Sequence, residues 1–417
     1  RAFLEVPIQN RLGSGRFGPD RFGALPPSPF AQLRALLDDV TPSQEPLSLA
    51  IGEPRHAPPS AVLEVLSAAR DSYSKYPPIG GTPEWRQAVV GWLSRRFDLS
   101  EALFEETTQI LPVNGTREGL FMAAQIAPQK VDGVVLIPNP FYQVYAAAAL
   151  AAGANPVYLP ATPATGHLPD LEALDDSLLA RTQAFYFCSP ANPQGAVADA
   201  SYLARLLELA RAHNFLLVVD ECYSEIYDNT PPPSALQLMQ AAGDSDMPLV
   251  VFHSLSKRSN LPGLRSGFCA GGRSVMRALA ALRAIAGPQS PLAVQEAAAL
   301  AWSDDAHVRE NRQKYGEKFA TAETLFAGCY DFYRPAGGFF LWLNVGDGEA
   351  AARHLWVTQG VRVLPGAYLA RDDTGGNNPA SAYIRVALVD EQETMTVALK
   401  RLKDGLESFN PATEGAD

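Results

Sequence analysis

The chain has 417 residues, of which 47% are hydrophobic and 19% are charged, so it carries enough apolar side chains for a large core. Its formal net charge is −11 and no cluster of Lys and Arg stands out, which makes nucleic acid and anionic membrane surfaces poor partners. At roughly 150 residues per domain, this length predicts two or three domains. No run of about 18 residues is apolar throughout, so we expect no membrane-spanning helix.

The four cysteines are spread along the chain. No two of them form a C-x-x-C pair, which argues against a zinc site, and their wide spacing argues against a disulfide framework. We therefore expect reduced thiols, a cytoplasmic protein and no metal site. The cysteines are Cys188, Cys222, Cys269 and Cys329.

In chain order, the first elements expected are helices over Phe30–Val40 and Glu118–Gln125. From there to residue 252, short apolar runs alternate with segments of helical period, which is typical of buried parallel strands joined by helices. The sequence therefore predicts an α/β fold with a mostly parallel central sheet covered by helices. The expected strands are Val134–Ile137, Phe185–Cys188, Leu216–Val219 and Leu249–Phe252, with helices at Tyr142–Leu150 and Ala200–Ala212.

The pattern changes after Ser290. Mixed elements follow, and they predict a smaller α+β domain. We expect residues 1–50 to form an N-terminal segment that packs on this domain, residues 51–290 to form the large domain and residues 291–417 to form the small one. The expected elements are a long helical stretch at Leu292–Phe326, strands at Phe339–Val345 and Ala382–Ala387, and a helix near Glu349–Gln359.

Polar residues follow two of the expected strands. Because ligands bind at the carboxyl ends of parallel strands, Asp220, which follows Leu216–Val219, is a candidate site residue. A helix cap or a surface acid is the alternative interpretation. Ser189–Gly195 follows Phe185–Cys188, and its prolines restrict the backbone that presents the amide of Asn192; a plain turn is the alternative.

Hydroxyl and basic side chains follow Leu249–Phe252. Ser254, Ser256 and Arg265 suit a phosphate group, because hydroxyls and a guanidinium fork complement phosphate oxygens. Lys257 suits another role, since a desolvated lysine near cationic groups has a lowered pKa and forms imines with carbonyl compounds. A solvated surface charge is the alternative for this lysine.

A glycine-containing loop precedes the expected helix Glu118–Gln125. It comprises residues 114–119, and backbone N–H groups at a helix N-terminus bind phosphate. Many glycine turns share this pattern, so the loop is a weak signal by itself. The chain lacks the G-x-x-x-x-G-K-[ST] pattern, which argues against a nucleoside triphosphatase.

Taken in order, these motifs resemble the class I and II aminotransferases of the pyridoxal 5'-phosphate (PLP) fold-type I superfamily. The matching segments run from Ile51–Pro54 to Ile384–Val386 and so cover nearly the whole chain. Each motif is weak alone, and their order and spacing together carry the resemblance. It implies PLP as cofactor, amino acids and 2-oxo acids as substrates, and a homodimer with shared active sites.

The resemblance assigns the central chemistry to Lys257, which would carry PLP as an imine and act as general acid and base at the substrate Cα. Asp220 would pair with the ring nitrogen and keep it protonated. Asn192 and Tyr223 would hold the phenolic oxygen. The expected phosphate ligands are Ser254, Ser256 and Arg265, together with the loop residues Gly115, Thr116 and Arg117.

The family's other site positions also have counterparts. Tyr142 matches the aromatic residue that stacks on the cofactor ring, with core packing as the alternative. Tyr76 matches a tyrosine that reaches the phosphate of the neighbouring subunit. Arg385 would bind the substrate α-carboxylate as a bidentate fork, with Gly52 and Asn192 beside it.

The loop Ser189–Gly195 departs from the family pattern at two positions. Ser189 stands where the family usually has Asn, and Gln194 stands where Thr is common. Neither change removes a group that the resemblance assigns to the cofactor, so the assignment of Asn192 is unaffected.

Three segments resemble bacterial N-succinyldiaminopimelate aminotransferases in particular, namely residues 24–30, 138–145 and 254–268. This resemblance implies amino transfer between N-succinyl-LL-2,6-diaminopimelate and 2-oxoglutarate in lysine and diaminopimelate synthesis. Aspartate-, aromatic-, alanine- and acetylornithine-type aminotransferases share the catalytic residues and stay alternatives, as do PLP β-lyases. A PLP-binding regulator would need a DNA-binding domain, and the residues before Gly52 are too few for one.

Overall fold

The computed structural model describes residues 4–5, 23, 25–104 and 109–410. These residues form an eight-stranded sheet in the order β1-β5-β4-β6-β7-β8-β9-β3. The strands from β5 to β8 run parallel, whereas β9 is antiparallel to its neighbours and β1 is antiparallel to β5, so the predicted mostly parallel sheet is confirmed. The strands are β1 (Leu4–Glu5), β3 (Ile110–Val113), β4 (Val134–Asn139), β5 (Asn155–Pro160), β6 (Thr182–Cys188), β7 (Leu216–Asp220), β8 (Leu249–Ser254) and β9 (Gly267–Gly271).

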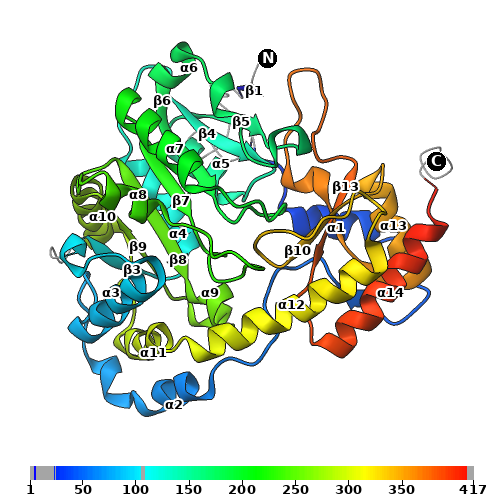
Figure 1. Cartoon of the computed structure of the whole chain (residues 1–417), viewed down its shortest axis with the longest axis horizontal. Coiled ribbons are helices and arrows are strands. Elements are labelled where there is room, and N and C mark those ends of the chain that lie inside the picture. The colour runs from blue at the N-terminus through cyan, green and yellow to red at the C-terminus, as the bar shows by residue number, and fades with distance from the viewer. Residues whose placement is uncertain (1–3, 6–22, 24, 105–108, 411–417) are drawn as a thin grey trace, which may run out of the picture.

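Helices cover both faces of this sheet because its central strands are apolar on both sides (Figure 1). In β7, Leu217 and Val219 join one core while Leu216 and Val218 join the other, as the two-residue period of a strand requires. The first core includes α2 (Ser60–Ala68), α3 (Pro83–Phe97), α7 (Ala200–His213), α8 (Ala235–Ala241) and α11 (Leu292–Ser303). The second includes α4 (Thr116–Ala123), α5 (Val144–Ala151) and α10 (Arg273–Ala286).

A second, smaller sheet has its own core. It is antiparallel, in the order β10-β13-β12, and β2 pairs with β11 beside it. On the same part of the molecule, Leu33 and Leu37 of α1 share a core with Trp356 (Figure 1). The division at residues 50 and 290 stays a prediction. The elements are α1 (Pro29–Leu37), β2 (Leu47–Ser48), α12 (Ala306–Phe326), β10 (Phe340–Asn344), α13 (Gly348–Gln359), β11 (Val361–Arg362), β12 (Leu364–Pro365), β13 (Tyr383–Ala387) and α14 (Gln392–Ser408).

The long helix expected over Leu292–Phe326 is in fact two helices, α11 and α12. Asp304 has extended backbone angles, and its carboxylate accepts a hydrogen bond from the N–H of Ala306 at 2.7 Å. Asp305 pairs with the buried Arg258 at 2.8 Å. The two acids thus end one helix and begin the next, while α11 packs on α2 and α3 and α12 packs on α14.

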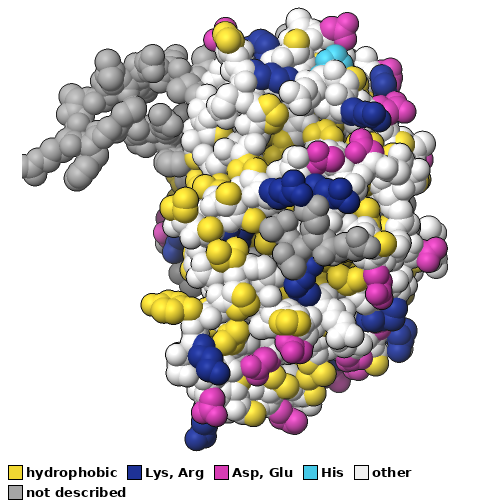
Figure 2. Space-filling view, turned by 90° about the vertical axis from the view of Figure 1, so that its left-hand side faces the viewer, with side chains coloured by type: hydrophobic (Ala, Val, Ile, Leu, Met, Phe, Trp, Pro, Cys, Tyr) yellow, Lys and Arg dark blue, Asp and Glu magenta, His cyan; other side chains and the backbone are white. Residues whose placement is uncertain are grey.

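The surface offers no broad cationic area on the face that Figure 2 shows, where Lys and Arg lie among acidic and hydrophobic side chains. In the described part of the chain, no helix has both the length and the apolar character that crossing a membrane requires. A site for an anionic ligand must therefore gather its cations locally.

A buried carboxylate ties α3 to α12. Glu225, in the segment after β7, accepts a hydrogen bond from the indole N–H of Trp92 at 3.1 Å. It also pairs with Arg312 at 2.8 Å and with Arg96 at 3.5 Å. Because Trp92 and Arg96 belong to α3 and Arg312 belongs to α12, this single side chain joins the two sheet systems.

Removing this carboxylate is expected to destabilise the protein strongly. Glu225→Ala leaves two largely enclosed guanidinium groups without their partner, which costs about 3–5 kcal/mol. The urea unfolding midpoint and slope measure the loss. The control is Glu310→Ala, which breaks an exposed pair with Lys314 and is expected to cost less than about 1 kcal/mol. Equal midpoints for the two variants would contradict the prediction.

Candidate active site

The predicted site residues lie at one edge of the large sheet, where its parallel strands end. Cys188 of β6 pairs with Asp220 of β7, which in turn pairs with Phe252 of β8. β6 and β7 therefore end at the same level, β8 continues past it to Ser254, and the segments that follow the three strands meet at this edge. These segments carry Asn192 and Lys257.

Asp220 is the last residue of β7, and its carboxylate is buried and hydrogen-bonded. One oxygen accepts from the hydroxyl of Tyr145 at 2.8 Å and the other accepts from the N–H of Cys222 at 3.2 Å. Burial raises the pKa of Asp220 above its ordinary value, and these hydrogen bonds oppose the rise. Its burial excludes the alternative of a surface acid, and a cationic partner would favour its charged form.

Tyr145 is a site neighbour that was not expected from the sequence. It lies near the start of α5, one turn after Tyr142, and its ring stacks on Tyr186 with 4.9 Å between ring centres. Burial raises the pKa of its hydroxyl, which therefore remains a hydrogen-bond donor to Asp220. The signal in the sequence is the three-residue spacing of two tyrosines at the start of an apolar helix.

Lys257 lies in the short helix α9 (Leu255–Arg258) directly after β8. Its Nζ donates a hydrogen bond to the carbonyl of Gly52 and lies 5.5 Å from the centre of the Phe339 ring. Burial lowers the pKa of Lys257 to about 8, and the charges of Arg385 and Arg265 act in the same direction. The alternative of a solvated surface lysine is therefore wrong.

Hydrogen-bond donors gather around the N-terminus of α4. Gly115 has a φ of 79°, and a Cβ at this position would collide with the guanidinium of Arg265, so only glycine fits. Gly267 allows Ser254 and Thr116 to lie close together. It pairs with Ser254 in the sheet, and it lies against the methyl group of Thr116. The donors are the first N–H groups of α4, at Thr116 and Arg117, the hydroxyls of Ser254 and Ser256, and Arg265.

Tyr142 lies at the rim of this group rather than deep in the core. Its hydroxyl accepts a hydrogen bond from Nε of Arg117 at 2.6 Å. Its ring is only partly buried and packs edge-on against Tyr145, with 5.8 Å between ring centres. One face of Tyr142 can therefore serve a flat ligand, which core packing alone would not provide.

Arg385 reaches the site from β13 of the smaller sheet. It donates hydrogen bonds to Oδ1 of Asn192 at 3.1 Å and to the carbonyl of Ala50 at 2.8 Å, and it lies 4.3 Å from the centre of the Phe340 ring. Its Nε is buried and has no hydrogen-bond partner among the described residues. Burial lowers the pKa of Arg385 to about 10. A buried guanidinium with an unsatisfied donor favours an anionic ligand.

An aromatic wall lies beside Lys257 and Arg385. Tyr223 packs edge to face on Phe339 and Phe340, with ring centres 5.4 and 6.0 Å apart. Burial raises the pKa of Tyr223, so its hydroxyl stays protonated. A Cβ at Gly52 would collide with Phe340, so this wall requires bare backbone at that point.

The two departures in the loop Ser189–Gly195 are structural in this chain. The hydroxyl of Ser189 accepts from the N–H of Ala198 at 3.1 Å, and Nε2 of Gln194 donates to the carbonyl of Ala161 at 3.2 Å. Both bonds hold the loop on either side of Asn192. Of the predicted residues, only Tyr76 lies apart from the others, and its side chain is 98% exposed.

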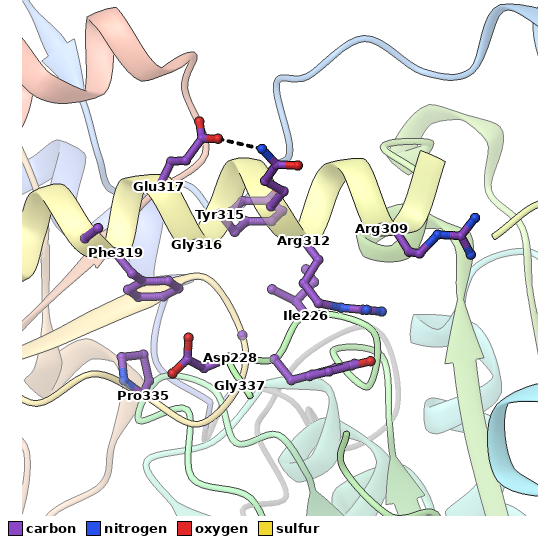
Figure 3. Close-up of a pocket in the computed structure, with 14 residues that line it drawn as sticks. Ile226, Asp228, Arg309, Arg312, Tyr315, Gly316, Glu317, Phe319, Pro335 and Gly337 are labelled. Atoms are coloured by element: carbon purple, nitrogen blue, oxygen red, sulfur yellow. Dashed lines mark hydrogen bonds between the residues drawn. The ribbon is translucent and has the colours of Figure 1, made fainter. Parts of the chain in front are cut away.

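A separate cavity of about 520 Å³ lies behind the aromatic wall, between α12 and the turns at 226–228 and 335–338 (Figure 3). None of the predicted site residues lines it. Among its polar groups, Gln313 bonds to Glu317 at 3.1 Å (Figure 3). Asp228 pairs with Arg334 at 2.7 Å. The chemistry gathered at the strand edge is therefore not in this cavity.

Known proteins are similar to this chain in both sequence and fold. The family model described as aminotransferase class I and II matches residues 44–402. An LL-diaminopimelate aminotransferase of Aquifex aeolicus is 28% identical over 395 residues, which cover 92% of this chain and 98% of the relative. A 4-dedimethylamino-4-oxo-anhydrotetracycline transaminase of Streptomyces rimosus is 32% identical, with 85% of this chain and 92% of the relative covered.

Solved structures agree with these sequence matches. An aminotransferase from Neisseria meningitidis superposes with a TM-score of 0.86 at 36% identity, covering 94% of this chain and 100% of the other. The aminotransferase AspB from Helicobacter pylori gives 0.85 at 34% identity, covering 92% and 99%. The fold is thus the α/β fold of PLP fold type I. The chain belongs to the class I and II aminotransferases, which depend on PLP.

Proposed function

We propose that this aminotransferase moves an amino group between N-succinyl-LL-2,6-diaminopimelate and 2-oxoglutarate. The observation that carries amino transfer is the meeting of Lys257, Asp220 and Arg385 at one strand edge. The choice of substrate is supported by residues 254–268, which resemble the N-succinyldiaminopimelate enzymes. Relatives named LL-diaminopimelate aminotransferase act on the same carbon skeleton, which also supports it.

The site fits PLP in charge and shape. The donors around Gly115 suit its phosphate, and the backbone space there is one that a Cβ would fill. We assign Asp220 to the ring nitrogen, because a buried carboxylate with a raised pKa gains from a cationic partner. We assign Asn192 and Tyr223 to the phenolic oxygen, and Tyr142 to one face of the ring.

In the proposed mechanism, Lys257 removes and returns a proton and Arg385 orients the substrate. Bound PLP withdraws electrons from the substrate Cα and so makes its proton acidic. Nζ of Lys257 takes that proton as the neutral amine and returns it as the ammonium, and its pKa of about 8 makes both forms accessible near neutral pH. Arg385 orients the α-carboxylate, which would also satisfy its unpaired Nε.

We further propose a homodimer in which Tyr76 acts across the interface. The support is its exposure, since a tyrosine that is 98% exposed has no packing role within its own chain. Tyr73, nearby in the chain, is 70% exposed and would be buried by the same contact. A partner subunit would thereby add a hydroxyl to the phosphate donors.

A second candidate substrate is LL-2,6-diaminopimelate itself. The observation that favours it is the printed name of several relatives, such as one from Desulforudis audaxviator that is 30% identical over 392 residues. The two candidates differ only at the distal end, which is a free amine in one and a succinyl amide with a further carboxylate in the other. Specificity therefore tests the two directly.

Lys257→Ala is expected to abolish transamination, because it removes the amine that we assign to the cofactor imine and to the transfer of the Cα proton. Borohydride reduction of the wild-type holoenzyme followed by peptide mapping should find the cofactor on the peptide that contains Lys257. Lys400→Ala, on the exposed face of α14, serves as the control and should keep full activity. A reduced label on any other lysine would contradict the assignment.

Asp220→Asn keeps the shape of the side chain and removes its charge. We expect kcat to fall by roughly 10²–10³-fold, by analogy with the loss of other electrostatic supports. Tyr145→Phe is the matched comparison, because it removes only one hydrogen bond to the same carboxylate and should cost roughly tenfold. Near-normal turnover by Asp220→Asn would remove Asp220 from the proposed mechanism.

A substrate panel tests the proposed specificity. With 2-oxoglutarate as acceptor, kcat/KM for N-succinyl-LL-2,6-diaminopimelate should exceed that for aspartate or phenylalanine by at least about a hundredfold, or roughly 2.7 kcal/mol. LL-2,6-diaminopimelate and acetylornithine complete the panel, and glutamate formation separates transamination from β-elimination. A preference for free LL-diaminopimelate would select the second candidate, and a preference for aspartate would discard both.

A further inference from the structure

A fully buried lysine lies outside the groups assigned above. Lys318, on α12, has no exposed surface. Its Nζ lies 2.6 Å from Nε2 of His56 and 3.3 Å from the carbonyl of Leu388, and it sits 4.8 Å from the centre of the Tyr315 ring. A buried ammonium is costly unless it is hydrogen-bonded, so these contacts constrain where the three segments can lie.

The hydrogen bonds form a chain with a fixed direction. An ammonium only donates, so Nε2 of His56 must accept and the ring proton must lie on Nδ1. That Nδ1–H then donates to the carboxylate of Glu391 at 3.1 Å. Burial and the charge of Lys318 lower the pKa of His56, which keeps the ring neutral as this chain requires.

The cluster joins the two segments that flank the proposed carboxylate site. His56 is four residues after Gly52, and Leu388 is three residues after Arg385. Between these segments, the N–H of Ala387 donates to the carbonyl of Leu49 at 2.7 Å, and Arg385 donates to Ala50. The contacts of Lys318 with His56 and Leu388 therefore add a further link between the same two segments.

We propose that Lys318 is a positioning residue that, through His56 and Leu388, sets the distance between Gly52 and Arg385. The proposal rests on the proposed role of Arg385 as the carboxylate ligand. Lys318 touches neither substrate nor cofactor. Its effect is on how well the site grips the α-carboxylate, which amino donor and oxo acid share.

The charge of Lys318 is set by the groups around it. Burial lowers its pKa to about 8, Lys314 acts in the same direction, and the carboxylates of Glu391, Asp390 and Glu317 oppose the fall. The ammonium is the donor in both contacts. We call the contacts of Lys318 with His56 and Leu388 the clamp. The clamp is therefore complete below a pH of about 8 and weakens as the pH rises through that value.

The test is Lys318→Met in the full-length holoenzyme, which keeps an unbranched side chain, one atom shorter, and removes the charge. We expect KM for both the amino donor and the oxo acid to rise by about tenfold, with kcat changed by less than about threefold. Lys314→Met is the matched control, because Lys314 lies one turn earlier on the same helix and pairs on the surface with Glu310. At a pH below about 8, where Lys318 is charged with or without Lys314, it should leave both constants unchanged.

The pH profile supplies a readout that a purely structural role would not move. In the wild type, KM should increase above a pH of about 8, whereas in Lys318→Met it should already be high at lower pH and should lack the part of that increase that Lys318 causes. Lys257 is present in both enzymes, so its titration cancels in the comparison. A Lys318→Met enzyme that keeps the wild-type KM, or one that loses kcat and thermal stability with KM unchanged, would overturn the proposal.

Two further variants keep the test decisive. If Lys318→Met fails to fold, Glu391→Gln decides, because Glu391 is 64% exposed and its loss weakens only the end of the chain. It should raise both KM values about twofold to threefold, and no change would overturn the clamp. Arg385→Lys separates the proposed role of Lys318 from the proposed role of Arg385. If Arg385→Lys raises KM and Lys318→Met does not, only the role of Lys318 is wrong. If neither variant raises KM, the assignment of Arg385 to the carboxylate is wrong as well.

Discussion

The alignment of three buried strands is the constraint on which this site depends. Strands β6, β7 and β8 are apolar on both sides, so each must lie inside the sheet with helices on both faces. Their parallel register points their carboxyl ends to the same edge of the sheet, and the polar residues at or after these ends then meet there. Asp220, Asn192 and Lys257 are close in space for this reason, although they belong to three segments of the chain. Arg385 reaches the same edge from another sheet, which makes the packing of the two sheets part of the site.

The acidic chain concentrates cations at this edge, and the fold stabilises them only in part. Burial lowers the pKa of Lys257 to about 8 and that of Arg385 to about 10, which is the sign of charged groups held away from water. Backbone carbonyls and the rings of Phe339 and Phe340 offset some of this cost. An anionic ligand can offset the remaining cost of burying these charges, because a ligand that pairs with the cations binds the folded state and stabilises it. Cofactor binding and folding stability are therefore linked in this protein.

Elements and residues with a strong local signal could be predicted from the sequence. The strands β4, β6, β7 and β8 are continuous apolar runs, and the residues after them carried the site. The strands β9 and β3 were not expected, because β9 includes two glycines and β3 a proline, and their pairing comes from tertiary contact. The helix α14 is also absent from the expected elements, although it carries apolar residues at helical spacing. The spacing of Tyr142 and Tyr145 is a signal for a shared helix face, but it does not show that Tyr145 bonds to the distant Asp220. Lys318 could not be found, because its partner His56 is distant in the sequence.

Lys257 and Lys318, two lysines of lowered pKa, are connected through the aromatic wall. Lys257 lies 5.5 Å from the Phe339 ring, which stacks on Tyr315 at 5.4 Å, and Lys318 lies 4.8 Å from Tyr315. Each ammonium thus meets an aromatic ring, whose electrons attract a cation, and the two stacked rings separate the charges. The segment from Gly52 to His56 spans the same distance, with one lysine bound at each end. A shift of this segment would therefore change both contacts at once. That coupling explains how a lysine outside the site can set the geometry inside it.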